Sequence, residues 1–200
     1  QTTEVKKVKN KKLIVGAAIG TNLEDLDRAR SLISNGVDLI VIDTAHGHSK
    51  KVLKTLSKIK KITNNIPTCV GNIATGEAAK KLYNSGADII KVGIGPGSIC
   101  TTRMVAGIGV PQISAIMDVK KALYKKNVKI ISDGGIKFSG DIAKALAAGA
   151  DAIMMGSIFA GTDESPGKKY KINGKFYKQY RGMGSIGAMS AGSANRYFQK

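Results

Sequence analysis

The stretch that decides the fold is Ser85-Gly86-Ala87-Asp88-Ile89-Ile90-Lys91-Val92, in which a tight turn leads directly into a short apolar run. Similar turns, Asn35-Gly36-Val37-Asp38 and Ala148-Gly149-Ala150-Asp151, also precede apolar runs. Gly at the second position favours the left-handed conformation that ends a helix. The chain therefore reuses one helix-to-strand connection three times.

Working outward from these turns, short apolar runs alternate with segments of helical pattern. The runs are rich in β-branched residues and do not alternate with polar residues, which is typical of strands buried on both faces of a parallel sheet. The runs predicted as strands are Leu13–Ala17, Leu39–Ile42, Thr68–Val70, Ile89–Val92, Ile130–Ser132 and Ile153–Met155. Helices are predicted at 22–35, 49–63, 75–85, 114–126 and 139–148, with Thr75 and Ser139 as N-caps.

Six β/α units define an α/β protein. They fit either a doubly wound sheet or most of an eight-stranded β/α barrel, because periodicity alone does not distinguish the two.

After Pro166 the pattern changes. Asn173-Gly174, between the apolar residues of 170–172 and 176–177, predicts a hairpin with a two-residue turn. Residues 181–195 mix Gly, Ser, Ala and Met and do not suffice for a filled core, so we expect a mobile flap there.

Composition excludes several classes of protein. The 200 residues with 42% hydrophobic content suit one globular domain. No run approaches the roughly 20 apolar residues of a membrane span, and two cysteines are too few for a disulfide framework. We therefore expect a cytoplasmic protein in a reducing compartment.

The net charge of +18 raises the alternative of a nucleic-acid binder. The lysines are spread through helix-like segments such as 50–54 and 120–123, which suits solvated outer faces better. Attraction of small anionic substrates is the functional use of such a charge that we favour. A nucleic-acid binder would instead show steep salt dependence of its affinity for an unrelated duplex.

The loop Gly93–Arg103 is the strongest functional segment, because the active site of a β/α barrel lies at the carboxyl ends of its strands. Its Gly and Pro residues favour a constrained loop with exposed backbone groups. Cys100 would be a nucleophile if nearby N–H dipoles or Arg103 stabilise its thiolate, and an inert thiol otherwise. Cys69, within a predicted strand, is expected to behave as a small hydrophobic residue.

Two glycine-bearing strand ends follow, Asp133-Gly134-Gly135 and Gly156-Ser157. Each is either a tight turn or a set of main-chain N–H groups for a phosphate, and the loops after the last strands of barrels often bind phosphate. With Asp133 available for ribose hydroxyls, they indicate a phosphorylated sugar ligand.

Asp43, Asn72, His46 and His48 also lie at or after predicted strand ends. The two histidines lack further acidic or His ligands nearby in sequence, so we predict no transition metal.

These residues resemble a known family. The segments 43–49, 93–103 and 180–185 are similar to inosine monophosphate dehydrogenase, over nearly the whole chain from Leu13. The related guanosine monophosphate reductase shares the cysteine loop but typically carries Asn and Tyr at the positions of His46 and His48. The segments 107–112, 133–136 and 196–198 also look like the dehydrogenase. The resemblance implies a (β/α)8 barrel.

The resemblance also implies roles for individual residues. Cys100 would add to the purine ring of inosine monophosphate before hydride passes to NAD, and Thr102, Arg196 and Tyr197 would assist hydrolysis. Arg as a base conflicts with its usual pKa above about 12. The implied substrate-binding residues are Ser98, Asp133, Gly134, Gly135, Gly156, Ser157, Tyr180, Gly182, Met183 and Gly184. NAD would contact Asp43, Asn72, Gly93 and Gly95, and potassium the carbonyls of Gly95, Gly97 and Cys100.

The family pattern divides the chain into a linker remnant (1–10), a barrel catalytic domain (11–168) and a hairpin with the start of a flap (169–200). Two N-terminal strands and the C-terminal segment of the family pattern fall outside this chain, so we expect that it does not close a barrel alone. The resemblance implies a homotetramer. A barrel that binds nucleotides without catalysis remains the rival, and it would tolerate Cys100→Ala.

Overall fold

A computed structural model describes residues 4–5, 13–190 and 193–197. Its main feature is a six-stranded parallel sheet in which the strands follow one another in chain order. A doubly wound sheet reverses its strand order at a switch point, and this sheet does not. The curled sheet with its alternating helices is therefore part of a (β/α)8 barrel. The strands are β1 (Gly16–Ile19), β2 (Leu39–Asp43), β3 (Thr68–Ile73), β4 (Ile89–Val92), β5 (Lys129–Asp133) and β6 (Ala152–Met154).

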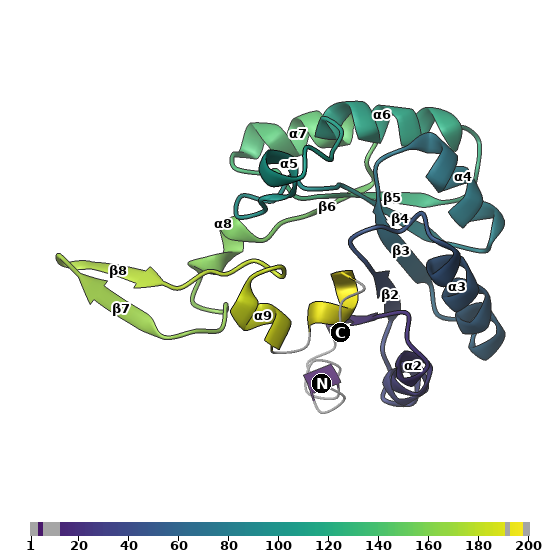
Figure 1. The fold of residues 1–200 in the computed structure, drawn as a ribbon, viewed down its shortest axis with the longest axis horizontal. Coiled ribbons are helices and arrows are strands. Elements are labelled where there is room, and N and C mark those ends of the chain that lie inside the picture. The colour runs from purple at the N-terminus through teal and green to yellow at the C-terminus, as the bar shows by residue number, and fades with distance from the viewer. Residues whose placement is uncertain (1–3, 6–12, 191–192, 198–200) are drawn as a thin grey trace.

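Helices cover one face of this sheet, and the C-terminal segment lies toward the other face (Figure 1). The core fills the space between sheet and helices, with Ile40, Val70 and Ile90 of the strands fully buried beside Leu56 and Ile116 of the helices. The covering helices are α2 (Glu24–Ser34), α3 (Lys50–Ile62), α4 (Gly76–Asn84), α6 (Gln112–Ala122) and α7 (Ser139–Ala147). Short helices α5 (Thr102–Val105) and α8 (Ser157–Ala160) follow β4 and β6.

The predicted helix starts are partly right. Thr75 is the N-cap of α4, and its hydroxyl accepts a hydrogen bond from the Ala78 amide. The prediction for Ser139 is wrong, because this residue is already the first of α7. The Asp141 carboxylate accepts hydrogen bonds from the amides of Lys137 and Phe138 instead, and it satisfies the free donors in place of a serine.

The first strand lies further along the chain than the apolar run predicted. Leu13 and Ile14 are 55% and 88% exposed, and pairing with β2 begins only at Gly16. The apolar residues Leu13 and Ile14 precede this strand, because the strand begins where its backbone pairs with β2.

The three repeated turns have the predicted backbone. Gly36, Gly86 and Gly149 all have positive φ values, of 83°, 97° and 117°. Each turn brings the chain back from a covering helix to the next strand, so the local rule read from the sequence is confirmed.

The aspartate that ends each turn has a further role. The carboxylate of Asp38 accepts from the amide of Val15, that of Asp88 from Thr68, and that of Asp151 from Ile130, at 2.8–2.9 Å. Each aspartate amide in turn donates to the carbonyl of the same residue. Every such aspartate thus forms a reciprocal pair with the residue at the beginning of the neighbouring strand.

The hairpin after Pro166 is confirmed as β7 (Lys169–Ile172) and β8 (Lys175–Lys178), an antiparallel pair that extends away from the sheet (Figure 1). Asn173 and Gly174 both have positive φ, as the favoured two-residue turn requires.

The flap segment contains α9 (Ile186–Ser190) and the 3-10 helix η1 (Ser193–Tyr197). Most of the predicted linker, residues 1–10, lies outside the described residues, although Val5 is described and buried. Within the described ranges, no helix has the length and apolar character needed to span a membrane.

Candidate active site

Three charged side chains share the sheet face that points away from the helices. Because side chains alternate along a strand, Ile42 and Val92 pack into the core while Asp43 and Lys91 face the opposite side. Asp133, the last residue of β5, lies with them, as its contacts show. The sequence therefore lines the concave face of the sheet with charge at the carboxyl ends of the strands, where barrel enzymes place their active sites.

Asn72 joins this group through an irregularity in β3. The register between β3 and β4 shifts between Gly71 and Ile73, so that Val70 and Ile73 both belong to the core. Such a shift re-aims the intervening side chain. The Asn72 amide group donates to the Gly93 carbonyl at 2.7 Å and to Asp133 Oδ2 at 2.9 Å.

Lys91 is the centre of the group, with a side chain that is only 3% exposed. Its Nζ donates to Asp43 Oδ1 at 2.9 Å, Asn72 Oδ1 at 2.5 Å and Asp133 Oδ2 at 2.6 Å. An ammonium group has three donors, and all three are used here. The cluster joins two residues predicted to bind NAD with the one predicted to bind the substrate ribose.

A cavity of about 120 Å³ lies beside this cluster. It is formed by the end of β5, the residues after β6, the cysteine loop and Tyr180. Two strand ends predicted to bind phosphate thus meet one loop around one space. Seven residues predicted to bind the substrate line it: Ser98, Asp133, Gly134, Gly135, Gly156, Ser157 and Tyr180. The other lining residues are Gly97, Ile136, Lys137 and Met155.

The glycines of this cavity are required by close packing. Gly134 and Gly135 have φ values of 89° and 80°, and a Cβ on Gly134 would lie 2.9 Å from the Pro96 side chain. A Cβ on Gly93 would lie 2.1 Å from the carbonyl oxygen of Asp133. The cysteine loop therefore packs against the end of β5 with no room for side chains between them.

The Cys100 side chain is partly exposed, and its thiol donates to the Thr102 hydroxyl at 3.2 Å. The Cys100 amide donates to the Gly97 carbonyl, which closes a turn in the loop. The predicted nucleophile and its predicted helper are thus in direct contact. Thr102 is also the first residue of α5, so a helix fixes the position of its hydroxyl.

Arg103 has a different role from the one considered for it. Its Nε donates to the Ile94 carbonyl at 3.0 Å and its Nη2 to the Val110 carbonyl at 2.6 Å. The planar guanidinium is therefore occupied by two backbone carbonyls, and it connects the start of the loop, at Ile94, with the segment that follows α5, at Val110. Stabilisation of the Cys100 thiolate by Arg103, one of two possibilities raised by the sequence, is not what this geometry supports.

Cys69 lies within β3 and is fully buried. Burial raises the pKa of its thiol from 9.0 to about 12, an increase that Lys91 reduces and Asp133 reinforces. This thiol is protonated at neutral pH and out of reach of solvent, as its position in a strand predicted.

Arg196 and Tyr197, which we call the flap dyad, lie at the same site. The Arg196 carbonyl accepts from the Ala45 amide, and its guanidinium forms an ion pair with Asp43 Oδ2. Burial lowers the pKa of Arg196, and the neighbouring Tyr197 raises it in part. The ion pair with Asp43 holds the guanidinium at the carboxyl end of β2.

The remaining predicted flap residues lie around the dyad and the cysteine loop. A Cβ on Gly184 would lie 3.1 Å from the Tyr197 hydroxyl, and a Cβ on Gly182 would lie 3.2 Å from Ile99. Met183 is 52% exposed. Gly95 has a φ of 74° and packs against the Arg103 side chain, so it belongs to the loop framework.

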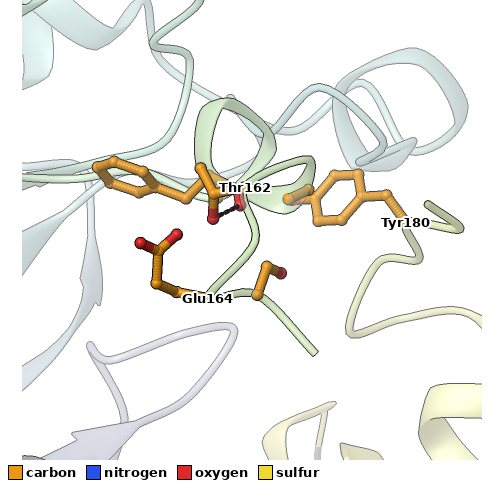
Figure 2. A pocket seen from close by; sticks show the side chains of 7 residues that line it. Thr162, Glu164 and Tyr180 are labelled. Carbon is orange, nitrogen blue, oxygen red and sulfur yellow. Dashed lines mark hydrogen bonds between the residues drawn. The ribbon is translucent and has the colours of Figure 1, made fainter. Parts of the chain in front are cut away.

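A second and more open cavity of about 550 Å³ adjoins the first, and Gly156 and Tyr180 line both. Figure 2 shows Thr162, Glu164 and Tyr180 on different sides of it. The Thr162 hydroxyl donates to the Phe159 carbonyl at 2.8 Å. A Cβ on Gly156 would lie 2.6 Å from the Tyr180 hydroxyl, so this glycine allows the tyrosine to reach the first cavity.

Sequence reasoning missed two cations of the site. Lys91 was read only as part of an apolar strand, although a lysine in the middle of a buried run is itself a signal of a paired charge. Lys137 lines the first cavity directly after the Gly134-Gly135 pair. Its place behind a predicted phosphate loop was the available signal.

The two histidines lie near each other, with ring centroids 6.3 Å apart. In the described part of the chain, no group of three or more His, Cys, Asp or Glu side chains is arranged to hold a metal ion.

Taken together, a curled parallel sheet, a thiol in a glycine-rich loop and a small cavity at the strand ends define a β/α-barrel protein with an enzyme-like site. The family model described as "IMP dehydrogenase / GMP reductase domain" matches residues 1–200. The chain belongs to this family.

Curated relatives agree with this assignment. The chain is 57% identical to an inosine-5'-monophosphate dehydrogenase of Rhizobium tropici, 56% to one of Aquifex aeolicus (strain VF5) and 59% to one of Staphylococcus aureus (strain Mu50 / ATCC 700699). Each match covers 94% of this chain and 38–39% of the relative. The chain thus spans about two fifths of the length of these relatives.

Proposed function

We propose that this chain is the catalytic part of an enzyme that oxidises inosine monophosphate to xanthosine monophosphate with NAD, the committed step of guanine nucleotide synthesis. One observation carries the proposal: Ser98, two residues before Cys100, lines the same cavity as the glycines of two strand ends. A nucleotide whose phosphate fills that cavity is held beside the loop with the nucleophile. The names of the relatives support the same reaction.

In this proposal the phosphate contacts Ser98, Gly135, Gly156, Ser157 and Tyr180. The cavity that these residues share supports this assignment. Gly134 shapes the same loop. Asp133 accepts hydrogen bonds from the ribose, and Met183 with Gly184 contacts the base, with Gly182 beside them.

Cys100 performs the first chemical step. Its sulfur forms a bond to carbon 2 of the hypoxanthine ring, the π electrons of the carbon–nitrogen double bond move to the adjacent ring nitrogen, and this nitrogen takes the proton that the thiol loses, which leaves to solvent in the next step. The electron pair of the C2–H bond then leaves as hydride, and the ring regains conjugation as a thioimidate on Cys100. NAD, when bound, supplies the hydride acceptor for this step.

Hydrolysis completes the cycle. A water oxygen bonds to carbon 2, the carbon–sulfur bond breaks, and the Cys100 thiol and xanthosine monophosphate are released. Thr102 positions the water. Arg196, once its guanidinium has lost a proton to solvent, takes a proton from this water together with Tyr197, and that proton ends on the departing Cys100 sulfur. The lowered pKa of buried Arg196 supports this role, because it makes loss of the guanidinium proton less unfavourable.

The proposed NAD site consists of Asp43, Asn72, Gly93 and Gly95, and two of its members connect directly, since Asn72 donates to the Gly93 carbonyl. Asp43 Oδ2 is already paired with Arg196. A ribose hydroxyl that binds this oxygen would share the carboxylate with Arg196, so the NAD site and the dyad meet at Asp43.

Potassium would be held by the carbonyls of Gly95, Gly97 and Cys100, hard oxygen donors that suit such a cation. The Gly97 carbonyl accepts the Cys100 amide with one lone pair and keeps the second for the cation. A homotetrameric, cytoplasmic enzyme is part of the same proposal.

The test uses the full-length protein with inosine monophosphate and NAD in potassium buffer. We expect NADH absorbance to appear, together with a nucleotide-sized mass increase on Cys100 in intact-mass analysis. Cys100→Ala should lose both signals, with turnover reduced by roughly 10⁴-fold or more. Cys69→Ala is the matched control and should keep both.

Two results would contradict the proposal. Nucleotide binding without NADH or adduct in the unaltered protein would leave a binding barrel that does no chemistry. Consumption of NADPH with guanosine monophosphate would assign the chain to the reductase branch of its family.

A further inference from the structure

No step of the proposed chemistry involves Lys91, although this residue lies at the centre of the site. Its side chain is 3% exposed, and its three donors are fully used by two carboxylates and one amide oxygen. A buried ammonium is unfavourable unless it is paired in this way. The chain keeps this cation at the carboxyl end of the sheet, among side chains that an apolar residue could not pair with.

The surrounding backbone leaves space for this side chain. Gly71 is the register partner of Lys91 on β3, and a Cβ at Gly71 would lie 2.7 Å from the Lys91 Cβ. Glycine on the neighbouring strand therefore lets the lysine rise from the sheet without obstruction. The shift in register next to it brings Asn72 into hydrogen-bonding distance.

The contacts connect two sites that the sequence treated as separate. Asp43 Oδ1 and Asp133 Oδ2 both accept from the same Nζ, and Asp133 Oδ2 also accepts from Asn72. One cation thus sets the orientation of the carboxylate assigned to the dinucleotide ribose and of the carboxylate assigned to the substrate ribose. Without it, two carboxylates would face each other across a poorly hydrated space.

We infer that Lys91 is a positioning residue that holds Asp43 and Asp133 in their ribose-binding orientations and so couples the substrate site to the dinucleotide site. This inference rests on the proposed function for the assignment of the two carboxylates. Lys91 touches neither reacting atom, so its effect belongs to the binding of both ligands rather than to the thiol chemistry.

The first experiment compares Lys91→Met with Lys129→Met in the full-length protein. Lys129 lies on the next strand, and its exposed side chain pairs with Asp151, so its loss should change little. Lys91→Met should raise KM for inosine monophosphate and for NAD together, each by about tenfold. The rate of Cys100 alkylation should remain within about twofold of the unaltered protein, because the cysteine loop is intact.

Lys91→Arg is the second variant, for the case in which Lys91→Met does not fold, as circular dichroism would show. It keeps the charge but replaces a compact ammonium by a planar fork. If Lys91 acts by position, KM for both ligands rises here too, by about threefold or more. If the cation only neutralises charge, both values stay unchanged and the inference is overturned.

A double-mutant comparison tests the coupling itself. Asp43→Asn should weaken the binding of inosine monophosphate, measured by calorimetry without NAD, by about fivefold in the presence of Lys91. In the Lys91→Met protein the same change should have no further effect. An equal effect in both backgrounds, or a rise in KM for only one ligand, would overturn the inference.

This design separates the inference from the proposed function. If the unaltered protein produces no NADH, the proposed function fails, whereas calorimetry still reports whether Lys91 links Asp43 to nucleotide binding. If NADH is produced and Lys91→Met leaves both KM values unchanged, only the inference fails.

Discussion

The two cysteines of the chain show how the backbone around a residue decides its chemistry. Cys69 lies in a strand that is buried along its whole length, and its pKa is raised to about 12. Cys100 lies in a loop with three glycines and one proline, where its thiol is partly exposed and contacts a hydroxyl. A strand covered on both faces removes water and polar partners, whereas the loop supplies both. The same side chain is a packing element in one place and a candidate nucleophile in the other.

The largest expected difference between them is in alkylation. At pH 8 a pKa of about 12 leaves roughly one Cys69 in 10⁴ as thiolate, and burial shields even that fraction. We expect iodoacetamide to modify Cys100 at least about 10³-fold faster than Cys69 in the folded protein. Peptide mapping by mass spectrometry measures both rates in one sample.

Denaturation is the control for this contrast, because both cysteines should then react at similar rates. Comparable rates for the two thiols in the native protein would show that β3 opens to solvent readily or that Cys100 is shielded.

A smaller effect is expected from loosening the loop that makes Cys100 different. Arg103→Met removes the hydrogen bonds to the carbonyls of Ile94 and Val110. We expect kcat to fall by about tenfold to a hundredfold, because misplacement of a nucleophile by about an ångström is costly. NADH production by the purified variant is the measurement.

The matched control is Arg30→Met, which removes an exposed ion pair with Asp27 on α2 and should leave kcat unchanged. An Arg103→Met enzyme with full activity would mean that the glycines and Pro96 hold the loop without the guanidinium.

The smallest expected effect concerns alkaline stability. The folded pKa of Cys69 lies above its unfolded value of 9.0, so between about pH 9 and 12 the unfolded chain loses this proton first and binds fewer protons than the native state. Stability from this group is complete below pH 9 and is lost as the pH rises toward 12. Between pH 8 and pH 10 the loss amounts to roughly 1 kcal/mol.

Urea unfolding at the two pH values measures this loss, with Cys69→Ala as reference, because other groups titrate in both proteins alike. An identical pH dependence in the two proteins would show that Cys69 keeps an ordinary pKa in the native state.

Much of the fold followed from local patterns. Ile89–Val92 was predicted to the residue, because its turn, its apolar run and its glycine-rich end all mark boundaries. The start of β1 was missed by three residues, since pairing with β2 and not apolar character decides where that strand begins. Ser139 was misassigned because Asp141, two residues later, performs the capping.

The site was predictable where it depends on residue types and positions along the chain. The strand ends with Gly134 and Gly156 meet the loop residue Ser98 at one cavity, as barrel geometry predicted. The position of Lys91 in an apolar run indicates a paired charge, but its partners were not predictable from strand patterns alone, since Asp43 and Asp133 come from other strands. The function of Arg103 likewise emerged only when Val110 was seen beside it in space.

The reciprocal pairs formed by Asp38, Asp88 and Asp151 have an evolutionary consequence. Each pair locks two adjacent strands together, β1 with β2, β3 with β4 and β5 with β6. The arrangement that recurs in this sheet is therefore a pair of strands whose relative position is fixed by two hydrogen bonds to one aspartate. These aspartate pairs lie at the end of the sheet opposite to Cys100. Residues at the carboxyl ends of the strands can therefore change without loss of the hydrogen bonds that fix the strand pairing.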